Sequence, residues 1–237
     1  MANNYFEFKQ FTIHQEHAAF RVTTDSVLLG AWAGFEGVKA VLDAGTGTGI
    51  LALMAAQRSE ARIVAVEPDN DSFKQALTNI ASSPWHERIT LVNGTLQGYS
   101  PEQPLRFDTI ITNPPFFNDS LPNSDARRAA TRHSLTLTHS ELIEAAQRLL
   151  VPGGTLQLVL PVTEAQLFEG MASTAGFFCH RRLRVRPTPL LPPARVLMSL
   201  SCNDGWCEDS EMVIEKGGRH IYSEEYVSLT KDFYLKF

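Results

Sequence analysis

Residues 43–67 contain side-chain types whose spacing suggests a ligand site. Asp43 is followed by glycines at every second position, Gly45, Gly47 and Gly49, and then by an apolar, helix-like stretch. A glycine-rich turn between a strand and a helix lets the backbone come close to a ligand. Glu67 ends the next apolar run, where a carboxylate accepts hydrogen bonds from both hydroxyls of a ribose. The segment therefore predicts a site for a nucleoside with free 2′ and 3′ hydroxyls.

The segment also has other interpretations, which the sequence supports to different degrees. A dinucleotide fingerprint has its third glycine three residues after the second, where this chain has Ile50. A dinucleotide oxidoreductase is therefore the least favoured enzyme class. A tight turn without a ligand remains an alternative, as does an ordinary exposed acid at the end of a strand for Glu67.

A second segment whose residues could take part in a reaction follows the apolar run Phe107–Thr112. It reads Asn113, Pro114, Pro115 and Phe116. Two prolines end a strand and fix the backbone that follows. Substrates of open α/β sheets bind at the carboxyl ends of the parallel strands. The segment therefore predicts a substrate site, with a rigid strand exit as the structural alternative.

Alternating strands and helices must position both segments. Short β-branched runs predict strands, and the longer stretches between them have helical periodicity. The predicted strands are 41–44, 62–67, 88–92, 107–112 and 155–160, and the predicted helices are 51–57, 70–81 and 140–150. Such alternation is typical of a parallel sheet covered on both faces. We therefore predict an α/β fold with a Rossmann-like, doubly wound, mostly parallel sheet.

The pattern changes after this core. Residues 151–154 predict a turn between helix and strand. A helix over 164–173 then precedes two extended segments, 181–186 and 195–202, which a proline-rich connection joins. Two strands joined in this way predict an antiparallel hairpin at the edge of the sheet.

The ends of the chain extend a single predicted domain that covers residues 1–237. An N-terminal extension, about residues 1–38, contains an alternating stretch at 6–13 that is typical of an edge strand, and an apolar helix over 26–32. A C-terminal addition, about residues 205–237, provides a strand and a serine-capped amphipathic helix over 223–233.

Composition excludes several classes of protein. The 21 basic and 26 acidic side chains give a formal net charge of -5, which argues against tight, indiscriminate binding of polyanions. The central apolar run 50–56 is far shorter than the roughly 20 residues of a membrane span, and the N-terminus has no secretory h-region. The three cysteines are too few and too unevenly spaced for a disulfide framework or a four-ligand zinc site. We expect a cytoplasmic monomer without a metal.

Arginines gather in one part of this acidic chain. Residues 126–195 hold nine arginines and four glutamates. Some of these arginines follow the Asn-Pro-Pro-Phe motif, and others alternate along a predicted strand and share one face. The candidates for contacts with RNA phosphates and bases are Arg127, Arg128, Arg132, Arg182, Arg184 and Arg186. The alternatives are solvated single arginines and an acid-paired edge strand.

Both motifs resemble those of known enzymes. The glycine-rich turn with Glu67 resembles the class I S-adenosylmethionine-dependent methyltransferases, which implies that cofactor, with Glu67 on its ribose and the glycine loop under its methionine portion. The second motif resembles the Asn-Pro-Pro-aromatic signature of methyltransferases that act on planar amines. This resemblance implies that the Asn113 side-chain oxygen and the Pro114 carbonyl accept the two amine hydrogens, while Phe116 stacks on the ring.

Four further stretches of the sequence indicate a particular methyltransferase family. The segments that look like the bacterial tRNA(Val) adenine-N6 methyltransferase family are 20–32, 83–89, 222–226 and 229–235. The resemblance covers nearly the whole chain and implies a tRNA substrate, methylated at N6 of adenosine 37. Ribosomal guanine N2, DNA adenine N6, protein glutamine and a non-catalytic RNA-binding role remain alternatives.

The same resemblance assigns further cofactor contacts. It places Thr24 and Asp25 over the cofactor, although a capping aspartate before a helix is an equally good account of Asp25. Where the family usually has an acid that binds the cofactor adenine, this chain has Thr95. A hydroxyl still accepts a hydrogen bond, and Asn93 is the alternative residue for this role.

Overall fold

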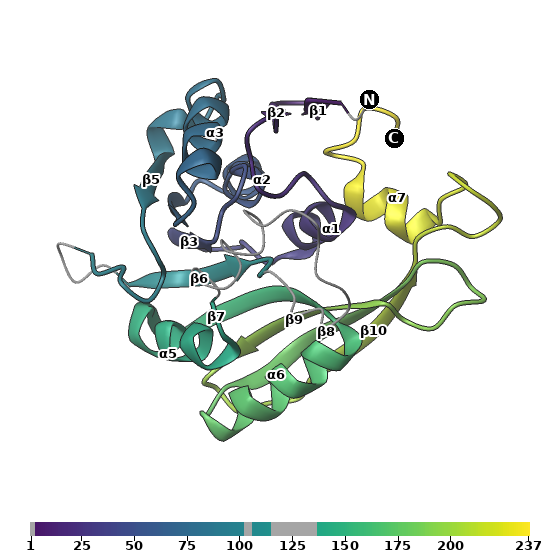
Figure 1. The fold of residues 1–237 in the computed structure, drawn as a ribbon. Coiled ribbons are helices and arrows are strands. Elements are labelled where there is room, and N and C mark those ends of the chain that lie inside the picture. The colour runs from purple at the N-terminus through teal and green to yellow at the C-terminus, as the bar shows by residue number, and fades with distance from the viewer. Residues whose placement is uncertain (1–2, 102–105, 115–136) are drawn as a thin grey trace, which may run out of the picture.

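A twisted sheet of eight strands forms the centre of the molecule (Figure 1). The computed structural model describes residues 3–101, 106–114 and 137–237. In sheet order the strands are β10 (Glu208–Val213), β8 (Phe178–Arg186), β9 (Arg195–Ser201), β7 (Leu150–Pro161), β6 (Phe107–Thr112), β3 (Ala40–Ala44), β4 (Arg62–Glu67) and β5 (Ile89–Asn93). In this sheet β9 alone runs antiparallel to its two neighbours, β7 and β8. The predicted doubly wound, mostly parallel sheet with an antiparallel hairpin is confirmed, and β10 lies outside that hairpin.

Helices cover both faces of the sheet (Figure 1). On one face lie α1 (Thr24–Trp32), α2 (Ile50–Arg58), α3 (Asn70–Ala81) and α7 (Glu224–Thr230). On the other face lie α5 (His139–Leu149) and α6 (Val162–Thr174). A short 3-10 helix, η1 (His86–Arg88), leads into β5. In the part of the chain that the structure describes, no helix is both long and apolar enough to cross a membrane.

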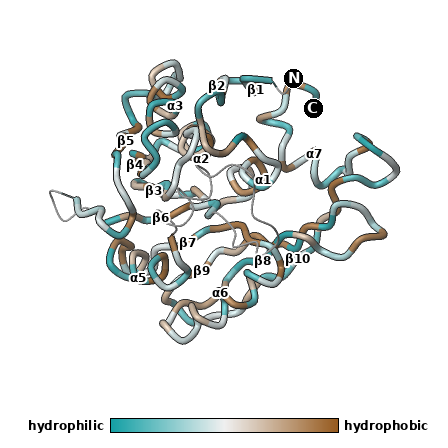
Figure 2. Tube along the Cα trace, viewed as in Figure 1, coloured by the Kyte–Doolittle hydropathy of each residue, from teal (hydrophilic) through white to brown (hydrophobic). Residues whose placement is uncertain are grey.

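Alternating side chains of the strands build two hydrophobic cores. Val41 and Ile111 face the core beneath α1 and α2, whereas their chain neighbours Leu42 and Ile110 face the core beneath α5 and α6. All four side chains are fully buried. Figure 2 shows brown, hydrophobic stretches in the strands between the two helix layers. Burial on both faces explains why these strands read as continuous apolar runs rather than alternating ones.

The predicted turn at residues 151–154 is wrong, because this segment lies inside a strand. β7 starts at Leu150, directly after α5, and its register against β6 shifts between Phe107 and Thr109. The extra residues of β7 interrupt the regular pairing with β6, and Gly153 among them takes a φ of 79°. A glycine at positive φ is a feature of bulges as well as of turns, so composition alone did not separate the two.

The prediction of one edge strand at 6–13 is also wrong. The segment forms a separate hairpin of β1 (Tyr5–Glu7) and β2 (Thr12–His14). The chain reverses where Phe8 stacks on Phe11, with ring centroids 4.6 Å apart. Both rings are buried in the core beneath α1 and α2, so burial of the aromatic pair accounts for the reversal.

The two ends of the chain meet (Figure 1). The Lys9 backbone amide donates to the Phe233 carbonyl at 2.9 Å, and Lys9 Nζ donates to the Phe237 carbonyl at 2.8 Å. Ser223 Oγ accepts from the Tyr226 amide at 3.0 Å, as predicted for a serine cap, although α7 ends at Thr230 rather than at 233. Phe8, Tyr226 and Phe233 belong to one hydrophobic core, so the terminal segments pack together on one face of the sheet.

Helices α1 and α2 approach closely at Gly30. A Cβ added at Gly30 would lie 2.5 Å from Met54 Sδ and 3.0 Å from Met54 Cβ. Gly170, in the exposed part of α6, has nothing within 4 Å of such a Cβ. The two glycines therefore separate the effect of packing from that of helix propensity.

We predict opposite effects of two glycine-to-alanine substitutions on the free energy of unfolding. Gly170→Ala should raise it by about 0.5–1 kcal/mol, because alanine is the better helix former. Gly30→Ala should lower it by about 1 kcal/mol, because overpacking costs more than the propensity gain. Urea unfolding followed by circular dichroism measures both. A stabilised Gly30→Ala variant would contradict the close packing of α1 on α2.

Candidate active site

Four of the predicted site regions lie in one row along the carboxyl edge of the sheet. β6, β3, β4 and β5 are consecutive parallel neighbours, and they end at Asn113, the glycine loop, Glu67 and Asn93. The register pairs Asp43 with Ile111, and Glu67 with Asn93. With neighbouring strands about 4.8 Å apart, the row covers about 14 Å. This is the edge at which open parallel sheets bind their ligands.

The glycine loop requires the backbone freedom of glycine. Gly45, Gly47 and Gly49 have φ values of 72°, 58° and 88°, in the left-handed region that other residues rarely adopt. The Gly45 and Thr46 amides both donate to the Val66 carbonyl, at 2.9 and 3.0 Å, so the loop is tied to the end of β4. A Cβ at Gly45 or Gly47 would meet no atom within 4 Å. The conformation, and not crowding within the protein, explains the glycine pattern.

Asp43 is a buried carboxylate at the start of this loop. Its Oδ2 accepts hydrogen bonds from Thr46 Oγ1 at 2.5 Å and from the Ala52 amide at 3.0 Å. Its Oδ1 is buried, and no described residue donates a hydrogen bond to it. Burial raises the pKa of Asp43 to about 7, against the lowering effect of the two hydrogen bonds, and the nearby Glu67 charge raises it further. The carboxylate therefore retains one acceptor for a donor group.

Glu67 clamps the loop from the next strand. Its Oε2 accepts from the Gly47 amide at 2.8 Å, and its Oε1 accepts from the Asp69 amide at 2.9 Å. The residue is 6% exposed, which excludes the alternative of an ordinary exposed acid. Burial raises the pKa of Glu67, while both backbone hydrogen bonds lower it. Each carboxylate oxygen accepts more than one hydrogen bond, so capacity for a ligand hydroxyl remains.

The end of β5 is more exposed than the rest of the row. Asn93 Nδ2 donates to Asn70 Oδ1 at 2.7 Å, which links β5 to the start of α3. Thr95 Oγ1 accepts from the Gly98 amide at 3.2 Å, and its hydroxyl proton remains able to donate. Both residues therefore lie at the predicted end of the site, and each has a polar atom engaged with the protein.

Asn113 lies at the opposite end of the row. Its Nδ2 donates to Ser26 Oγ of α1 at 2.9 Å, and no described residue donates to its Oδ1. Thr112 Oγ1 donates to the Ala44 carbonyl at 2.7 Å, which joins the ends of β6 and β3. Pro114 is buried. The remaining two residues of the motif, Pro115 and Phe116, lie outside the described residues.

The start of α1 borders Asn113. Thr23 is the N-cap of this helix, since its Oγ1 accepts from the Ser26 amide at 3.2 Å. Asp25 is therefore not the cap, and its Oδ2 instead accepts from Arg195 Nε at 2.7 Å. Thr24 is exposed at the first position of the helix. The hydrogen bond from Asn113 to Ser26 places Thr24 and Asp25 beside the predicted substrate end of the row.

The arginines of β8 do not form an open positive stripe. Arg182 pairs with Glu169 and with Asp209, the latter at 2.8 Å. The neighbouring arginine of the stripe, Arg184, binds both Asp209 oxygens at 2.7 and 2.8 Å. Arg186 pairs with an acid as well, at 3.0 Å from Glu211. The structure thus has the acid-paired strand that was the alternative, because β10 brings acids beside β8. Arg127, Arg128 and Arg132 lie outside the described residues.

Sequence reasoning missed the polar residues that support the site. The apolar pattern places Ser26 only at the start of a helix and gives it no role in the site. On α3, Asn79 Nδ2 donates to the Thr48 carbonyl at 2.8 Å and to the His14 carbonyl at 2.8 Å. The buried polar side chains Ser72, Gln75 and Asn79 recur at helical spacing, which is a signal for a polar helix face that binds another segment.

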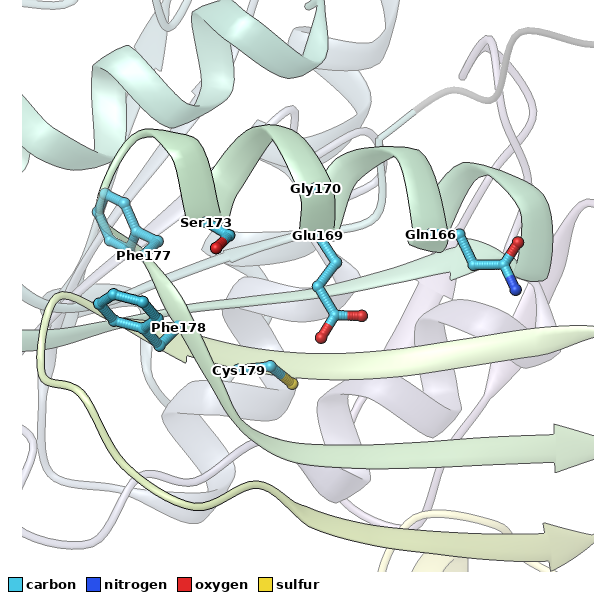
Figure 3. A pocket seen from close by; sticks show the side chains of 7 residues that line it. All are labelled: Gln166, Glu169, Gly170, Ser173, Phe177, Phe178 and Cys179. Carbon is cyan, nitrogen blue, oxygen red and sulfur yellow. The ribbon is translucent and has the colours of Figure 1, made fainter.

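A cavity away from this edge holds none of the predicted site residues. It lies between α6 and β8, and Glu169, Ser173 and Cys179 are among its lining side chains (Figure 3). Glu169 is already paired with Arg182. The row along the carboxyl edge therefore remains the candidate active site.

The residues of the row fit a nucleoside cofactor with a charged amino acid portion. The free oxygen of buried Asp43 and the glycines at positive φ provide an acceptor and an unobstructed backbone surface. Glu67 provides a second carboxylate. Together with the doubly wound sheet, this arrangement defines the class of Rossmann-like, class I methyltransferases.

Comparisons with known proteins agree with this class. The profile of the methyltransferase small domain family matches residues 27–167. A predicted O-methyltransferase from Agrobacterium tumefaciens has the same fold, with a TM-score of 0.65 and 16% identity over 88% of this chain and 96% of the other. A glycopeptide N-methyltransferase, MtfA, in complex with S-adenosylmethionine has a TM-score of 0.54 and 15% identity over 77% of this chain and all of the other.

Sequence relatives define the family more closely. Proteins named tRNA1(Val) (adenine(37)-N6)-methyltransferase are 42% identical in Bacteroides fragilis and 43% identical in Trichodesmium erythraeum, each over 100% of both chains. The relative of the same name in Pseudoalteromonas translucida is 42% identical over 98% of both chains. This chain belongs to the family of tRNA1(Val) (adenine(37)-N6)-methyltransferases.

We predict that Asp43→Asn changes how stability depends on pH. Because the pKa of Asp43 is about 7 in the folded protein, against an ordinary value of 3.8, the folded protein holds an extra proton between these values, and its stability falls as pH rises. Asparagine does not titrate, so the stability of the variant relative to the parent should increase from pH 4 to pH 7 and then level off. The increase should be at most about 4 kcal/mol.

Chemical unfolding at several pH values measures this difference. Glu60→Gln is the control, because its side chain is 98% exposed and lies 4.0 Å from Arg88 Nε. That variant should follow the parent across the whole range. A stability difference for Asp43→Asn that does not change with pH would contradict a raised pKa for this carboxyl group.

Proposed function

We propose that this protein transfers a methyl group from S-adenosylmethionine to the exocyclic N6 of an adenine in tRNA, adenosine 37 of tRNA(Val). The observation that carries the proposal is the Asn113 amide, which is held through Nδ2 and has no described donor at Oδ1, on the same sheet edge as the glycine loop and Glu67. The names of the full-length relatives support the choice of substrate.

In this proposal the cofactor lies along the row from Glu67 to the start of α1. Glu67 accepts hydrogen bonds from the ribose hydroxyls, and the glycine loop lies under the methionine portion, next to the free oxygen of Asp43. Asn93 or Thr95 binds the adenine ring at the β5 end. Thr24 and Asp25 cover the cofactor at the α1 end.

The reacting amine needs activation by geometry. Its lone pair is delocalised into the adenine ring, so a planar exocyclic amine is a poor nucleophile. Asn113 Oδ1 and the Pro114 carbonyl accept hydrogen bonds from its two N–H groups and draw the nitrogen towards a pyramidal shape. Phe116 stacks on the ring. When bound, S-adenosylmethionine would supply the activated methyl group and leave as a neutral thioether, and the methylated nitrogen would release one of its two protons to water. The protein contributes positioning and electrostatics, and it holds the base outside its stack.

The remaining parts of the proposal concern the whole chain. Residues 1–237 act as one domain and as a monomer in the cytoplasm. Arg127, Arg128 and Arg132 bind tRNA phosphates. Arg182, Arg184 and Arg186 are left out of the RNA interface, since each is paired with an acid.

We predict that the purified protein forms N6-methyladenosine in unmodified tRNA incubated with labelled S-adenosylmethionine. Nucleoside mass analysis identifies the product. Asn113→Ala should lower turnover by about 100-fold or more and change cofactor affinity by less than about twofold, whereas Asn203→Ala, at an exposed asparagine, should leave both unchanged. Label found in N2-methylguanosine, or only in protein, would contradict the adenine assignment.

We predict that Glu67→Gln weakens the binding of S-adenosylhomocysteine by about 10- to 100-fold, as expected for hydrogen bonds to a charged group. An amide NH2 replaces one of the acceptor oxygens that bind the backbone and the ribose. Titration calorimetry measures the affinity.

Asp108→Asn is the matched control for this substitution. The Asp108 carboxylate also accepts two backbone hydrogen bonds, from the Lys39 and Ala40 amides at 2.8 and 2.9 Å, but at the opposite edge of the sheet. It should lower stability without changing cofactor affinity. Equal losses of affinity in the two variants would indicate that Glu67 acts only through the stability of the fold.

A further inference from the structure

We propose that Ser26 is a positioning residue that fixes the orientation of the Asn113 amide, so that Oδ1 faces the substrate amine. The inference rests on the proposed function and extends it to a residue that precedes the glycine loop in the chain. Ser26 is 7% exposed in the first turn of α1. Its Oγ accepts from Asn113 Nδ2 at 2.9 Å, across 87 positions of sequence.

Orientation matters because the two ends of an amide have opposite roles. Rotation of the Asn113 amide by half a turn exchanges Oδ1, an acceptor, with Nδ2, a donor. Only the oxygen can accept a hydrogen of the substrate amine. With Nδ2 in its place, the hydrogens of the Asn113 amide would face the hydrogens of the substrate amine. The site therefore needs a contact that distinguishes the two ends.

Ser26 distinguishes them through its own partner. A hydroxyl both donates and accepts, so serine alone would bind either end of the amide. Thr23 Oγ1 lies 3.2 Å from Ser26 Oγ and also accepts from the Ser26 amide. Thr23 is exposed, so its own hydroxyl proton has access to solvent. Either hydroxyl of this pair can donate. In this proposal the Ser26 proton points to Thr23, which leaves the Ser26 lone pairs for Asn113 Nδ2.

The helix that carries Ser26 is held on several sides. Asp25 binds Arg195 of β9 at 2.7 Å, and the helix residues that follow Ser26 are buried in the core. The carbonyls of Gly30 and Ala33 accept from Arg58 at 2.9 and 2.6 Å. A hydroxyl on such a fixed element orients its partner more strongly than one on a loop.

The test compares turnover in single and double variants. Ser26→Ala should lower kcat about five- to tenfold, the equivalent of one neutral hydrogen bond, with KM for tRNA and for S-adenosylmethionine changed less than about twofold. Ser26→Thr keeps the hydroxyl and should recover most of the loss. Ser83→Ala is the matched control, because Ser83 is also buried and its hydroxyl donates to the Ile80 carbonyl at 2.8 Å, at the end of α3.

A second background separates positioning from a structural role. In Asn113→Asp both terminal atoms are oxygens, so rotation no longer matters, and adding Ser26→Ala should change kcat by less than about twofold. A purely structural role of Ser26 would cost the same factor in both backgrounds and would overturn the inference. So would an unchanged kcat in Ser26→Ala, or a loss that follows a lower Tm.

A spectroscopic measurement tests the contact without activity. In 15N-labelled full-length protein, Ser26→Ala should shift the Asn113 side-chain amide resonance and speed exchange of its protons with water, and Ser83→Ala should not. An Asn113 resonance unaffected by Ser26→Ala would overturn the inference. A parent protein that methylates no tRNA adenine would instead contradict the proposed function, and the two failures are therefore distinguishable.

Discussion

Two buried carboxylates hold the glycine loop, and the geometry of the site depends on them. A loop with three glycines at positive φ has few side chains of its own to fix it. Asp43 binds Thr46 and the start of α2, while Glu67 reaches across from β4 to the Gly47 amide. Burial of both acids is unfavourable, as their raised pKa values indicate, and charge-assisted hydrogen bonds to the loop offset part of that cost. The two acids that shape the loop therefore also lie at the candidate active site.

The N-terminal extension is connected to the same loop through hydrogen bonds to α3. Asn79 of α3 binds the Thr48 carbonyl of the loop and both backbone groups of His14. Gln75 and Ser72, further along the same helix face, accept from the amides of residues 17 and 19. The segment held in this way leads to the cap of α1 and so to the residue that binds the Asn113 amide. One continuous set of contacts therefore links the glycine loop with the Asn113 amide.

Local sequence patterns predicted the parts of the fold that depend on local physics. Periodicity placed β4, α3 and β6 at their observed bounds, and strand ends then placed Glu67 and Asn113 on one edge. Contacts between distant residues were not predictable in this way, because a serine at position 26 carries no sign of an asparagine at 113. The acids of β10 likewise neutralise arginines of β8 only because parallel pairing brings Asp209 opposite Arg182.

The arginine pairing changes what the net charge of -5 implies for a tRNA substrate. Arginine side chains in the described part of residues 126–195 bind protein acids or carbonyls, as Arg148 binds the carbonyls of Tyr99 and Leu96. Side chains that are already paired within the protein make few contacts with RNA phosphates and so release few counterions. The affinity for RNA therefore depends less steeply on salt concentration. Phosphate contacts, including those proposed for Arg127, Arg128 and Arg132, carry no direct sequence information, so the proposed discrimination between RNAs rests on contacts to bases. In the proposed function, the candidate active site at the carboxyl edge of the sheet therefore selects the base as well as positions it.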